Sequence, residues 1–275
     1  MIDTFEKEIE QRERFEFGKN WQRFLSVLNE NRIAEAEKSL KQMLEVEDLQ
    51  GKSFLDIGSG SGLFSLAARR LGAKVYSFDY DTDSVACTQE LKRLYFVDDS
   101  DWTVEEGSVL NLSYLQSLGK FDIVYSWGVL HHTGAMWKAL ENINTLPAEN
   151  GKLFISIYNN QGRASNGWKS IKKLYNVLPS LLKYLVLYPS FIRLWLPSTI
   201  RDFITGKPFH TWKNYVASRG MSPWWDVVDW VGGYPFEVAK PEEIFDFYRQ
   251  RGYRLEQLRT CAGGHGCNEF VFAKI

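Results

Sequence analysis

The chain has 275 residues, a length that fits one large α/β domain or one domain with a sizeable insertion. Hydrophobic residues make up 44% of the chain and charged residues 24%, values near globular averages that exclude a disordered or collagen-like protein. The formal net charge of −1 excludes a polycation that coats nucleic acid along its whole length.

The cysteines and the apolar stretches indicate in which cellular compartment the protein is expected. The three cysteines are an odd number without a Cys-x-x-Cys pair, which argues against a disulfide framework and favours a reducing compartment. The first 17 residues are too charged for a signal peptide. The most apolar stretch, 181–196, contains Lys183, Pro189 and Arg193, so it lacks the ~20 unbroken apolar residues of a spanning helix. We therefore expect a soluble, cytoplasmic protein.

Residues 1–50 are predicted to be a helical segment. Apolar residues recur at spacings of three and four, first from Trp21 to Leu28 and then from Ile33 to Leu44. The residues between the two runs, Asn29–Asn31, are predicted to form a turn.

From residue 51 the period changes, and short apolar runs alternate with stretches of helical spacing. The predicted strands are 53–57, 74–79, 102–106, 121–127 and 152–158, and the predicted helices are 63–71, 84–95 and 135–146. Asp81 is the expected N-cap of the second helix, and Pro241 opens a further helix before two β-like runs joined by a glycine-rich turn. Such alternation predicts an α/β fold, a doubly wound, mostly parallel Rossmann-like sheet with an antiparallel last strand, over residues 51–158 and 241–275.

Residues 159–240 do not fit the alternation. Six of the ten tryptophans lie there, and the segment has a formal charge of +7. An insertion that begins after a strand stands where open α/β sheets bind ligands. We therefore interpret residues 159–240 as a helical, basic and aromatic cap over the substrate.

The strongest motif is Asp56-Ile57-Gly58-Ser59-Gly60-Ser61-Gly62, with Asp79 nineteen residues after Gly60. A glycine turn after a buried strand lets the backbone pass beneath a ligand, and an acid after the next strand accepts hydrogen bonds from ribose hydroxyls. The dinucleotide fingerprint has Gly or Ala where this chain has Leu63. The motif therefore favours a nucleoside without a pyrophosphate.

At these residues the chain resembles the class I S-adenosylmethionine-dependent methyltransferases, over about 52–158 and the tail from residue 241. The resemblance implies S-adenosylmethionine as cofactor, with Asp56, Gly58, Ser59 and Gly60 around its methionine part. It also implies that Asp79 holds the ribose and that Tyr80, Ser108 and Val109 border the adenine. The segment Val129-Leu130-His131-His132 is similar to the small-molecule branch, including the ubiquinone-biosynthesis methyltransferases. The Asn/Asp-Pro-Pro-Tyr/Phe motif of base-modifying enzymes is absent from the sequence at that place, which disfavours a nucleic-acid acceptor.

Three residues at the end of the fourth strand or just after it are candidates for the chemistry. Histidine is suited to remove an acceptor proton near neutral pH, so His131 or His132 is a candidate catalytic base. The alternative is that the two rings only hydrogen-bond to the backbone and orient the loop. Trp127 is expected either to pack on the cofactor or to be a buried core aromatic.

The cap supplies the candidate substrate contacts. Tyr158 and Asn159 follow the fifth strand and are predicted to bind the substrate, with turn formation as the alternative. Asp226 and Asp229 are three residues apart and are expected to share a helix face. Asp226 is a candidate substrate contact, and Asp229 is a further candidate catalytic base. Arg219 is expected to pair with one of these carboxylates or with an anionic substrate group.

Two further features are weaker. The cluster Cys261, His265 and Cys267 matches no common zinc spacing, so we predict a tight hairpin and no metal. Residues 159–219 hold ten Lys or Arg and one acid. They are interpreted as a peripheral membrane contact, as a dimer interface or pocket roof, or as helices with solvated lysines.

Taken together, these features predict an S-adenosylmethionine-dependent methyltransferase. The acceptor is expected to be a small anionic or apolar molecule, with oxygen as the favoured methylation site. A tRNA methyltransferase and a non-catalytic cofactor-binding scaffold are the alternatives.

Overall fold

The computed structural model describes the chain except residues 1–6, 10, 12–13, 19–24, 26–27 and 220–222, and of residues 216–219 it describes the backbone alone. Seven strands form one sheet in the order β3-β2-β1-β4-β5-β7-β6. The strands are β1 (Ser53–Ile57), β2 (Lys74–Asp79), β3 (Trp102–Glu106), β4 (Phe121–Trp127), β5 (Pro147–Tyr158), β6 (Tyr253–Arg259) and β7 (Cys267–Lys274). Strands β1 to β5 pair in parallel, whereas β7 is antiparallel to both β5 and β6. The predicted fold class is confirmed.

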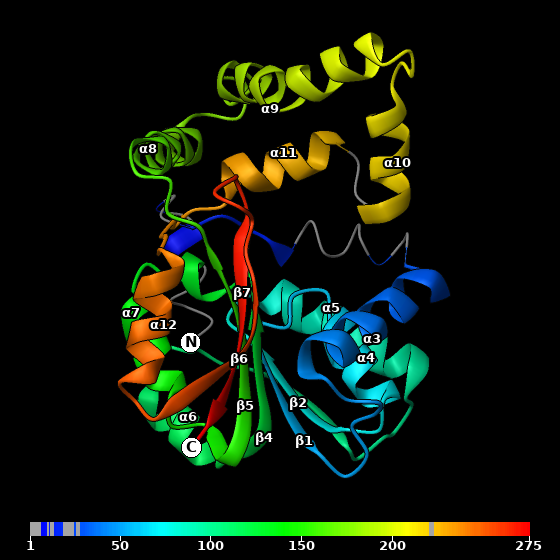
Figure 1. The fold of residues 1–275 in the computed structure, drawn as a ribbon, viewed down its shortest axis with the longest axis vertical. Helices are drawn as coiled ribbons and strands as arrows, with labels where there is room; N and C mark the ends of the chain where they lie inside the picture. The colour runs from blue at the N-terminus through cyan, green and yellow to red at the C-terminus, as the bar shows by residue number, and fades with distance from the viewer. Residues whose placement is uncertain (1–6, 10, 12–13, 19–24, 26–27, 220–222) are drawn as a thin grey trace.

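Helices cover both faces of the sheet (Figure 1). On one face lie α3 (Glu30–Leu44), α4 (Leu63–Arg70) and α5 (Thr82–Tyr95). On the other lie α6 (Leu112–Leu118), α7 (Met136–Ile143) and α12 (Pro241–Arg249), with the short 3-10 helix η1 (Leu130–His132) after β4. This two-sided covering is what a parallel sheet requires, because its strands expose apolar side chains on both faces.

Helix starts follow the capping residues in the sequence. Asp81 accepts a hydrogen bond from the backbone N–H of Asp83 (3.0 Å), so α5 begins at residue 82, two residues before the predicted start. Asn29 caps α3 in the same way through the N–H of Arg32 (3.2 Å). The turn predicted over Asn29–Asn31 is therefore wrong beyond its first residue, since Asn31 already lies in the helix. Most of the predicted helical run from Trp21 to Leu28 lies outside the described residues.

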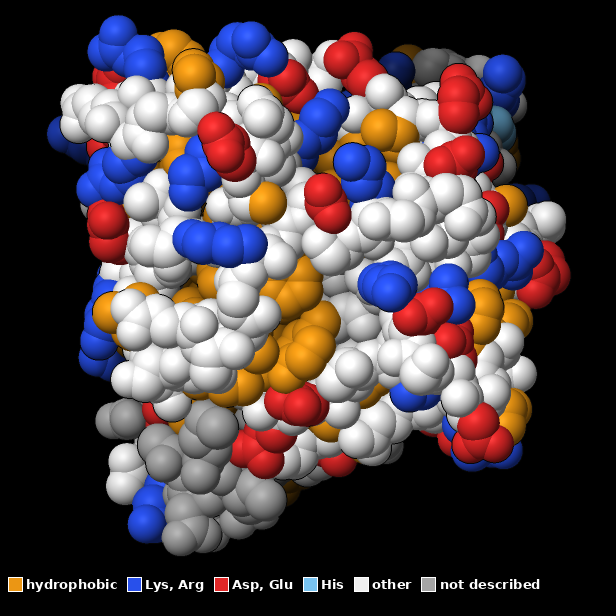
Figure 2. Space-filling view, turned by 90° about the horizontal axis from the view of Figure 1, so that it is seen from below, with side chains coloured by type: hydrophobic (Ala, Val, Ile, Leu, Met, Phe, Trp, Pro, Cys, Tyr) orange, Lys and Arg blue, Asp and Glu red, His pale blue; other side chains and the backbone are white. Residues whose placement is uncertain are grey.

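Four helices form a layer above the carboxyl ends of the strands (Figure 1). They are α8 (Arg163–Val177), α9 (Tyr184–Ile204), α10 (His210–Arg219) and α11 (Pro223–Gly232), and we call them the cap. Both ends of the cap meet, because Asn159 bridges to Ala239 and the N–H of Asn160 donates to the carbonyl of Ala239 (3.1 Å). At the opposite end of the molecule, positive and negative side chains are interspersed (Figure 2).

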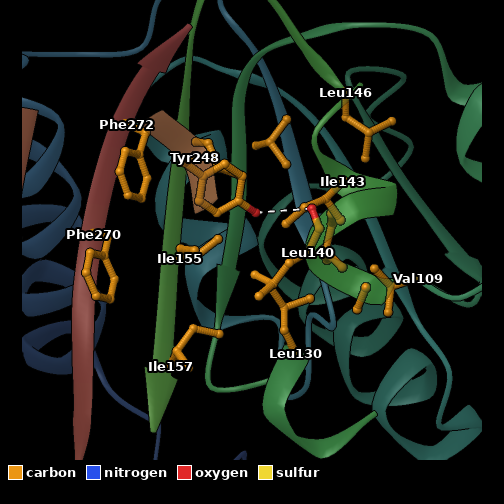
Figure 3. Close-up of a cluster of buried hydrophobic side chains, with 14 of the residues drawn as sticks. Val109, Leu130, Leu140, Ile143, Leu146, Ile155, Ile157, Tyr248, Phe270 and Phe272 are labelled. Atoms are coloured by element: carbon orange, nitrogen blue, oxygen red, sulfur yellow. Dashed lines mark hydrogen bonds between the residues drawn. The ribbon is translucent and has the colours of Figure 1, made fainter. Parts of the chain in front are cut away.

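Two apolar clusters flank the sheet. One packs Leu130, Ile155 and Phe272 against α7 and α12, and Tyr248 donates its hydroxyl to the carbonyl of Leu140 (3.2 Å; Figure 3). The other joins α3, α4 and the opposite sheet face. Each fully buried side chain of this size contributes about 1.5–3 kcal/mol by leaving water. The sheet is thus a rigid base for the loops at its carboxyl edge.

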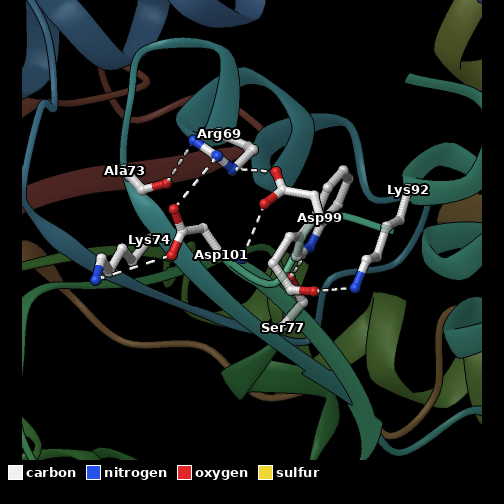
Figure 4. Close-up of polar contacts among 8 residues, drawn as sticks. Arg69, Ala73, Lys74, Ser77, Lys92, Asp99 and Asp101 are labelled. Carbon is white, nitrogen blue, oxygen red and sulfur yellow. Dashed lines mark hydrogen bonds and ion pairs between the residues drawn. The ribbon is translucent and has the colours of Figure 1, made fainter. Parts of the chain in front are cut away.

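A polar cluster fixes the start of β3. Arg69 on α4 pairs with Asp99 (2.6 Å) and Asp101 (3.6 Å) and donates to the carbonyl of Ala73 (Figure 4). Next to this cluster, Ser77 accepts a hydrogen bond from the indole N–H of Trp102 (3.0 Å). Ser77 in turn belongs to the network beneath the glycine loop, described next.

Candidate functional site

A cavity of about 1770 Å³ lies between the carboxyl edge of the sheet and the cap. Its walls come from the glycine loop, from the ends of β2 and β4, from the N-terminal segment and from α9 and α11. Pockets for single small molecules are typically about 300–1,000 Å³. The cavity therefore has room for two ligands side by side.

The glycine loop after β1 depends on residues that lack a Cβ. Gly58 has φ +75°, and a Cβ there would come within 2.4 Å of the Val129 side chain. Gly62 has φ +79°, and a Cβ there would meet the backbone of Thr88 at 2.9 Å. Both conformations are costly for other residues. The loop is therefore held close to the middle of α5 and to the loop after β4, with Ser59 and Gly60 lining the cavity.

Asp79 connects the end of β2 to this loop. Its two carboxylate oxygens accept backbone hydrogen bonds from Gly60 and Asp81, each at 2.9 Å. Burial nevertheless raises the pKa of Asp79 to about 6. Each oxygen keeps acceptor capacity, so the carboxylate can take two further hydroxyl donors such as those of a ribose.

Asp56 lies beneath the loop and is almost fully buried, at 2% exposure. Its carboxylate accepts a hydrogen bond from Ser65 (2.5 Å), which also bonds to Ser77 (2.7 Å). Burial raises the pKa of Asp56 to about 7, and the neighbouring Asp79 adds to this effect. Two carboxylates at one end of the cavity favour a cation there and would repel a pyrophosphate.

The residues expected around the adenine also line the cavity. Tyr80, Ser108 and Val109 are among them, and the guanidinium of Arg14 lies 5.1 Å from the ring centre of Tyr80. Trp127 lines the cavity as well, with 42% of its surface exposed, and its indole N–H donates to Glu269 (3.0 Å). The interpretation of Trp127 as a buried core aromatic is therefore wrong.

The two histidines have different surroundings. His132 lines the cavity, whereas His131 is fully buried and does not. The ring of His131 packs on Tyr158 (3.8 Å between centres), and its Nδ1 accepts the backbone N–H of Tyr158 (3.3 Å). This arrangement corrects the assignment of His131 as a base and matches the alternative, in which the ring orients the backbone.

His132 has a defined tautomer. Its Nδ1 lies 2.7 Å from the carbonyl oxygen of Pro235, and because a carbonyl only accepts, Nδ1 carries the proton. The lone pair is then on Nε2. Burial, followed by the nearby charge of Lys172, lowers the pKa of His132 to about 3, so the ring is neutral at physiological pH.

Some of the residues expected to bind the substrate line the cavity and others do not. Tyr158, Asp226 and Asp229 line the cavity. Asn159 does not. Its amide donates to the carbonyl of Gly264 (3.3 Å) and its oxygen accepts from Asn268 (3.1 Å), so it ties β5 to the β6–β7 hairpin instead. Arg219 ends α10, and its side chain lies outside the described residues.

Sequence reasoning missed the N-terminal segment as part of the site. Arg14 donates to the backbone carbonyl of His132 (3.0 Å) and pairs with Glu8 (2.6 Å). The ring of Phe17 lies 5.0 Å from that of His132, and the N–H of Gly18 donates to Asp81 (2.7 Å). Apart from the Arg14–Glu8 pair, no local pattern signals these contacts, because their partners are more than 60 residues away in the sequence.

The tip of the β6–β7 hairpin is the second element whose position the sequence did not reveal. His265, Cys267 and Glu269 line the cavity from this tip. The ring of His265 lies 5.7 Å from Trp230 and 5.9 Å from Trp168, so it packs among aromatic rings of the cap. Within the described residues, no group of three His, Cys, Asp or Glu side chains is placed to hold a metal ion.

These contacts fit a nucleoside that carries a positive charge in place of phosphates. The cavity offers carboxylates for a ribose and a cation, and a glycine loop that approaches closely. The sheet and the cavity are those of a doubly wound α/β protein with space for a nucleoside and a second ligand.

Comparison with known proteins specifies the family. The sequence model of the methyltransferase domain matches residues 28–210, two thirds of the chain. The chain belongs to this family, and its resemblance to the S-adenosylmethionine-dependent methyltransferases, with S-adenosylmethionine as their methyl donor, is confirmed.

Individual relatives match over shorter segments. The ribosomal protein L11 methyltransferase of Prochlorococcus marinus is 44% identical over 82 residues, which are 30% of this chain and 27% of that protein. The ubiquinone biosynthesis O-methyltransferase of Glaesserella parasuis is 28% identical over 116 residues, 42% of this chain and 49% of that protein. The chain thus matches between about a quarter and a half of the length of these two relatives.

Solved structures extend the likeness to the fold. The magnesium protoporphyrin IX methyltransferase of Synechocystis PCC 6803, crystallised with bound SAH, superimposes with a TM-score of 0.52 at 14% identity. The match covers 88% of this chain and 83% of that one. At this identity the likeness concerns the fold alone.

Proposed function

We propose that this protein transfers the methyl group of S-adenosylmethionine to an oxygen of a small, apolar, hydroxyl-bearing acceptor. The observation that carries the proposal is one cavity lined both by the carboxylates of the glycine loop and by aromatic side chains of the cap. When bound, S-adenosylmethionine supplies a methyl group already activated by a positive sulfur. The protein then has mainly to hold the acceptor oxygen in line at ~3–3.5 Å and to exclude water.

The sheet half of the cavity is assigned to the cofactor. Asp79 would hold the ribose hydroxyls, and Asp56 would complement the positive charge near the glycine loop. Tyr80, Ser108 and Val109 would border the adenine. Trp127 would pack beside the sulfonium, where the face of an indole ring attracts a cation.

The cap half is assigned to the acceptor. Tyr158, Trp195 and Trp230 offer flat apolar surfaces to the cavity. Asp226 and Asp229 on α11 place carboxylates in the same half. Because aromatic rings line this half, of the two acceptor chemistries expected from the sequence we favour the apolar over the anionic one. A hydroxyl can donate to either carboxylate.

His132 is assigned as the group that receives the acceptor proton through Nε2. A base with so low a pKa does not ionise an alcohol in advance. As the acceptor oxygen takes the methyl group and the donor sulfur keeps the electrons of the bond that breaks, Nε2 of His132 would receive the hydroxyl proton and pass it to water. Because an oxygen that has just gained a methyl group is a strong acid, a weak base in the right place suffices. Asp229 is the alternative acceptor of this proton.

The test is to incubate the purified protein and a cell extract with methyl-labelled S-adenosylmethionine. We expect label in material that partitions into organic solvent, and mass spectrometry of the isolated product should locate the methyl group on oxygen. The Asp79→Asn variant is the matched negative control. Label in tRNA or in protein would instead support a macromolecular acceptor, and no transfer to any fraction would favour a cofactor-binding scaffold.

A further inference from the structure

Helix α9 has two apolar faces. One face packs on α10 and α11, where Leu187 and Trp195 are buried and Leu194 lines the cavity. The other face points away from the protein, since α9 is the outermost element of the cap (Figure 1). A helix at the surface of a globular protein normally exposes polar residues on its outer side. Here the outer side needs a different explanation.

The outer face carries an unbroken stripe of large apolar side chains. They recur at spacings of three and four and are between 48% and 70% exposed, namely Leu185, Tyr188, Ile192, Leu196, Ile200 and Phe203. Such spacing follows the helical period, so these side chains form one line along the whole helix, about 30 Å long. We call it the α9 stripe. Of 22 exposed large apolar residues in the described part of the chain, 13 lie within residues 174–209.

The exposed charges beside the α9 stripe are positive. Arg193 and Arg201 each follow a stripe residue by one position, so they line one edge of it, and both are exposed. The single acid of residues 159–219, Asp202, is 5% exposed and accepts hydrogen bonds from the backbone and hydroxyl of Thr211 (both 2.7 Å). The surface next to the stripe therefore attracts anions, in contrast to the mixed charges at the opposite end of the molecule (Figure 2).

We propose that the α9 stripe docks on the headgroup region of an anionic lipid bilayer. An apolar face edged by arginines, which extend their charged ends toward lipid phosphates, is the pattern of a helix that lies in the plane of an interface. A second copy of the chain fits less well. A twofold contact of stripe against stripe would bring the arginines of both copies together without a carboxylate between them.

The backbone of α9 restricts how deeply it can insert. Pro189 and Pro197 lie inside the helix, and because proline lacks an N–H, the carbonyls of Leu185 and Arg193 have no intrahelical partner four residues on. Such carbonyls need water or headgroups. No helix in the described part of the chain combines the length and the hydropathy to cross a bilayer. The contact we infer is therefore peripheral.

This inference stands independently of the proposed function, but the two would fit together. The inner face of α9 lines the cavity through Leu194 and Trp195 while the stripe faces outward. A docked cap would thus bring the cavity within one helix diameter, ~10–12 Å, of the lipid surface.

The test is flotation of the full-length protein with phosphatidylcholine vesicles, with and without phosphatidylserine. We expect the protein to float with the anionic vesicles and to be released by salt. Leu185→Glu combined with Ile192→Glu should reduce binding at least tenfold. Arg193→Gln combined with Arg201→Gln should weaken the affinity for anionic vesicles by about fivefold per arginine and leave the affinity for neutral vesicles unchanged.

The matched control is Leu94→Glu combined with Val97→Glu, which alters two exposed apolar residues on the far side of the molecule and should bind like the wild type. Binding of adenosylhomocysteine shows that each variant is folded. This folding control does not depend on whether an acceptor is found. Failure of the wild type to float, or equal flotation of the stripe variant, would overturn the proposal. So would a dimer that the stripe variant dissociates in the absence of any vesicle binding.

Discussion

The two halves of the cavity are built in different ways. The sheet half is built around backbone turns and carboxylates of two short segments, 56–62 and 79–81, to which the loop after β3 and the end of β4 add Ser108, Val109 and Trp127. The cap half consists of side chains brought together from α9, α11, the N-terminal segment and the β6–β7 hairpin. The contrast suggests that the donor is held by local geometry and the acceptor by long-range packing. If so, changes in the two halves should affect different steps.

The largest effect is expected at His132. His132→Ala should lower turnover of the identified acceptor by about 10²–10⁴-fold, because a positioned proton acceptor contributes that much. Affinity for adenosylhomocysteine, measured by calorimetry, should stay unchanged. His265→Ala is the matched change of a second histidine that lines the cavity, and its effect should be far smaller. Turnover within a few-fold of the wild type in the His132 variant would transfer the role to Asp229.

The second effect concerns the sheet half. Asp79→Asn removes the charge and one of the acceptors while keeping the shape, so adenosylhomocysteine should bind about 10–100-fold more weakly. Asp226→Asn, a matched change in the cap half, should leave this affinity intact and alter acceptor use instead. Equal losses of cofactor affinity in both variants would contradict the division of the cavity.

A third effect is the pH dependence of cofactor binding. Burial raises the pKa of Asp56 to about 7 and of Asp79 to about 6 in the free protein. A bound cation and ribose hydroxyls favour the ionised carboxylates, so binding must release protons below pH 7. Affinity for S-adenosylmethionine should therefore fall as pH drops, by about tenfold between pH 7.5 and pH 5.5. Calorimetry across this range should show a flatter profile for Asp56→Asn, and an unchanged profile would argue against Asp56.

The smallest effect concerns the packing of the cap. Lys172 is fully buried among the rings of Trp230 and Phe236, and burial lowers its pKa to about 7, although Asp229 opposes the shift. Between pH 7 and pH 10 the unfolded chain binds more protons than the folded one, so stability should rise with pH by about 1 kcal/mol per unit. Urea unfolding at pH 7 and pH 9 should show this rise, and Lys172→Met should reduce it. An identical rise in both proteins would mean that Lys172 is not its source.

The sequence predicted the sheet half well because the interactions there are local. The alternation of β1 to β5 with helices followed from periodicity except for α6, between β3 and β4, which the periodicity did not predict. Asp81 marked the start of α5 by its own capping bond. Helix α7 and strand β5 differ from prediction only in their ends, with α7 shorter and β5 starting at Pro147. End positions depend on packing that no single segment encodes.

By itself, the sequence determined most of the α/β alternation, the glycine loop and the carboxylates beside it, since each follows from residues within about twenty positions of one another. Only the tertiary structure separated His132, at the cavity wall, from His131, sealed beneath Tyr158. The tertiary structure alone placed Asn159 against the hairpin and Arg14 at the site. It also revealed that the α9 stripe points outward. The physical reason is that these positions depend on contacts between segments far apart in the sequence. The local sequence around each residue does not determine such contacts.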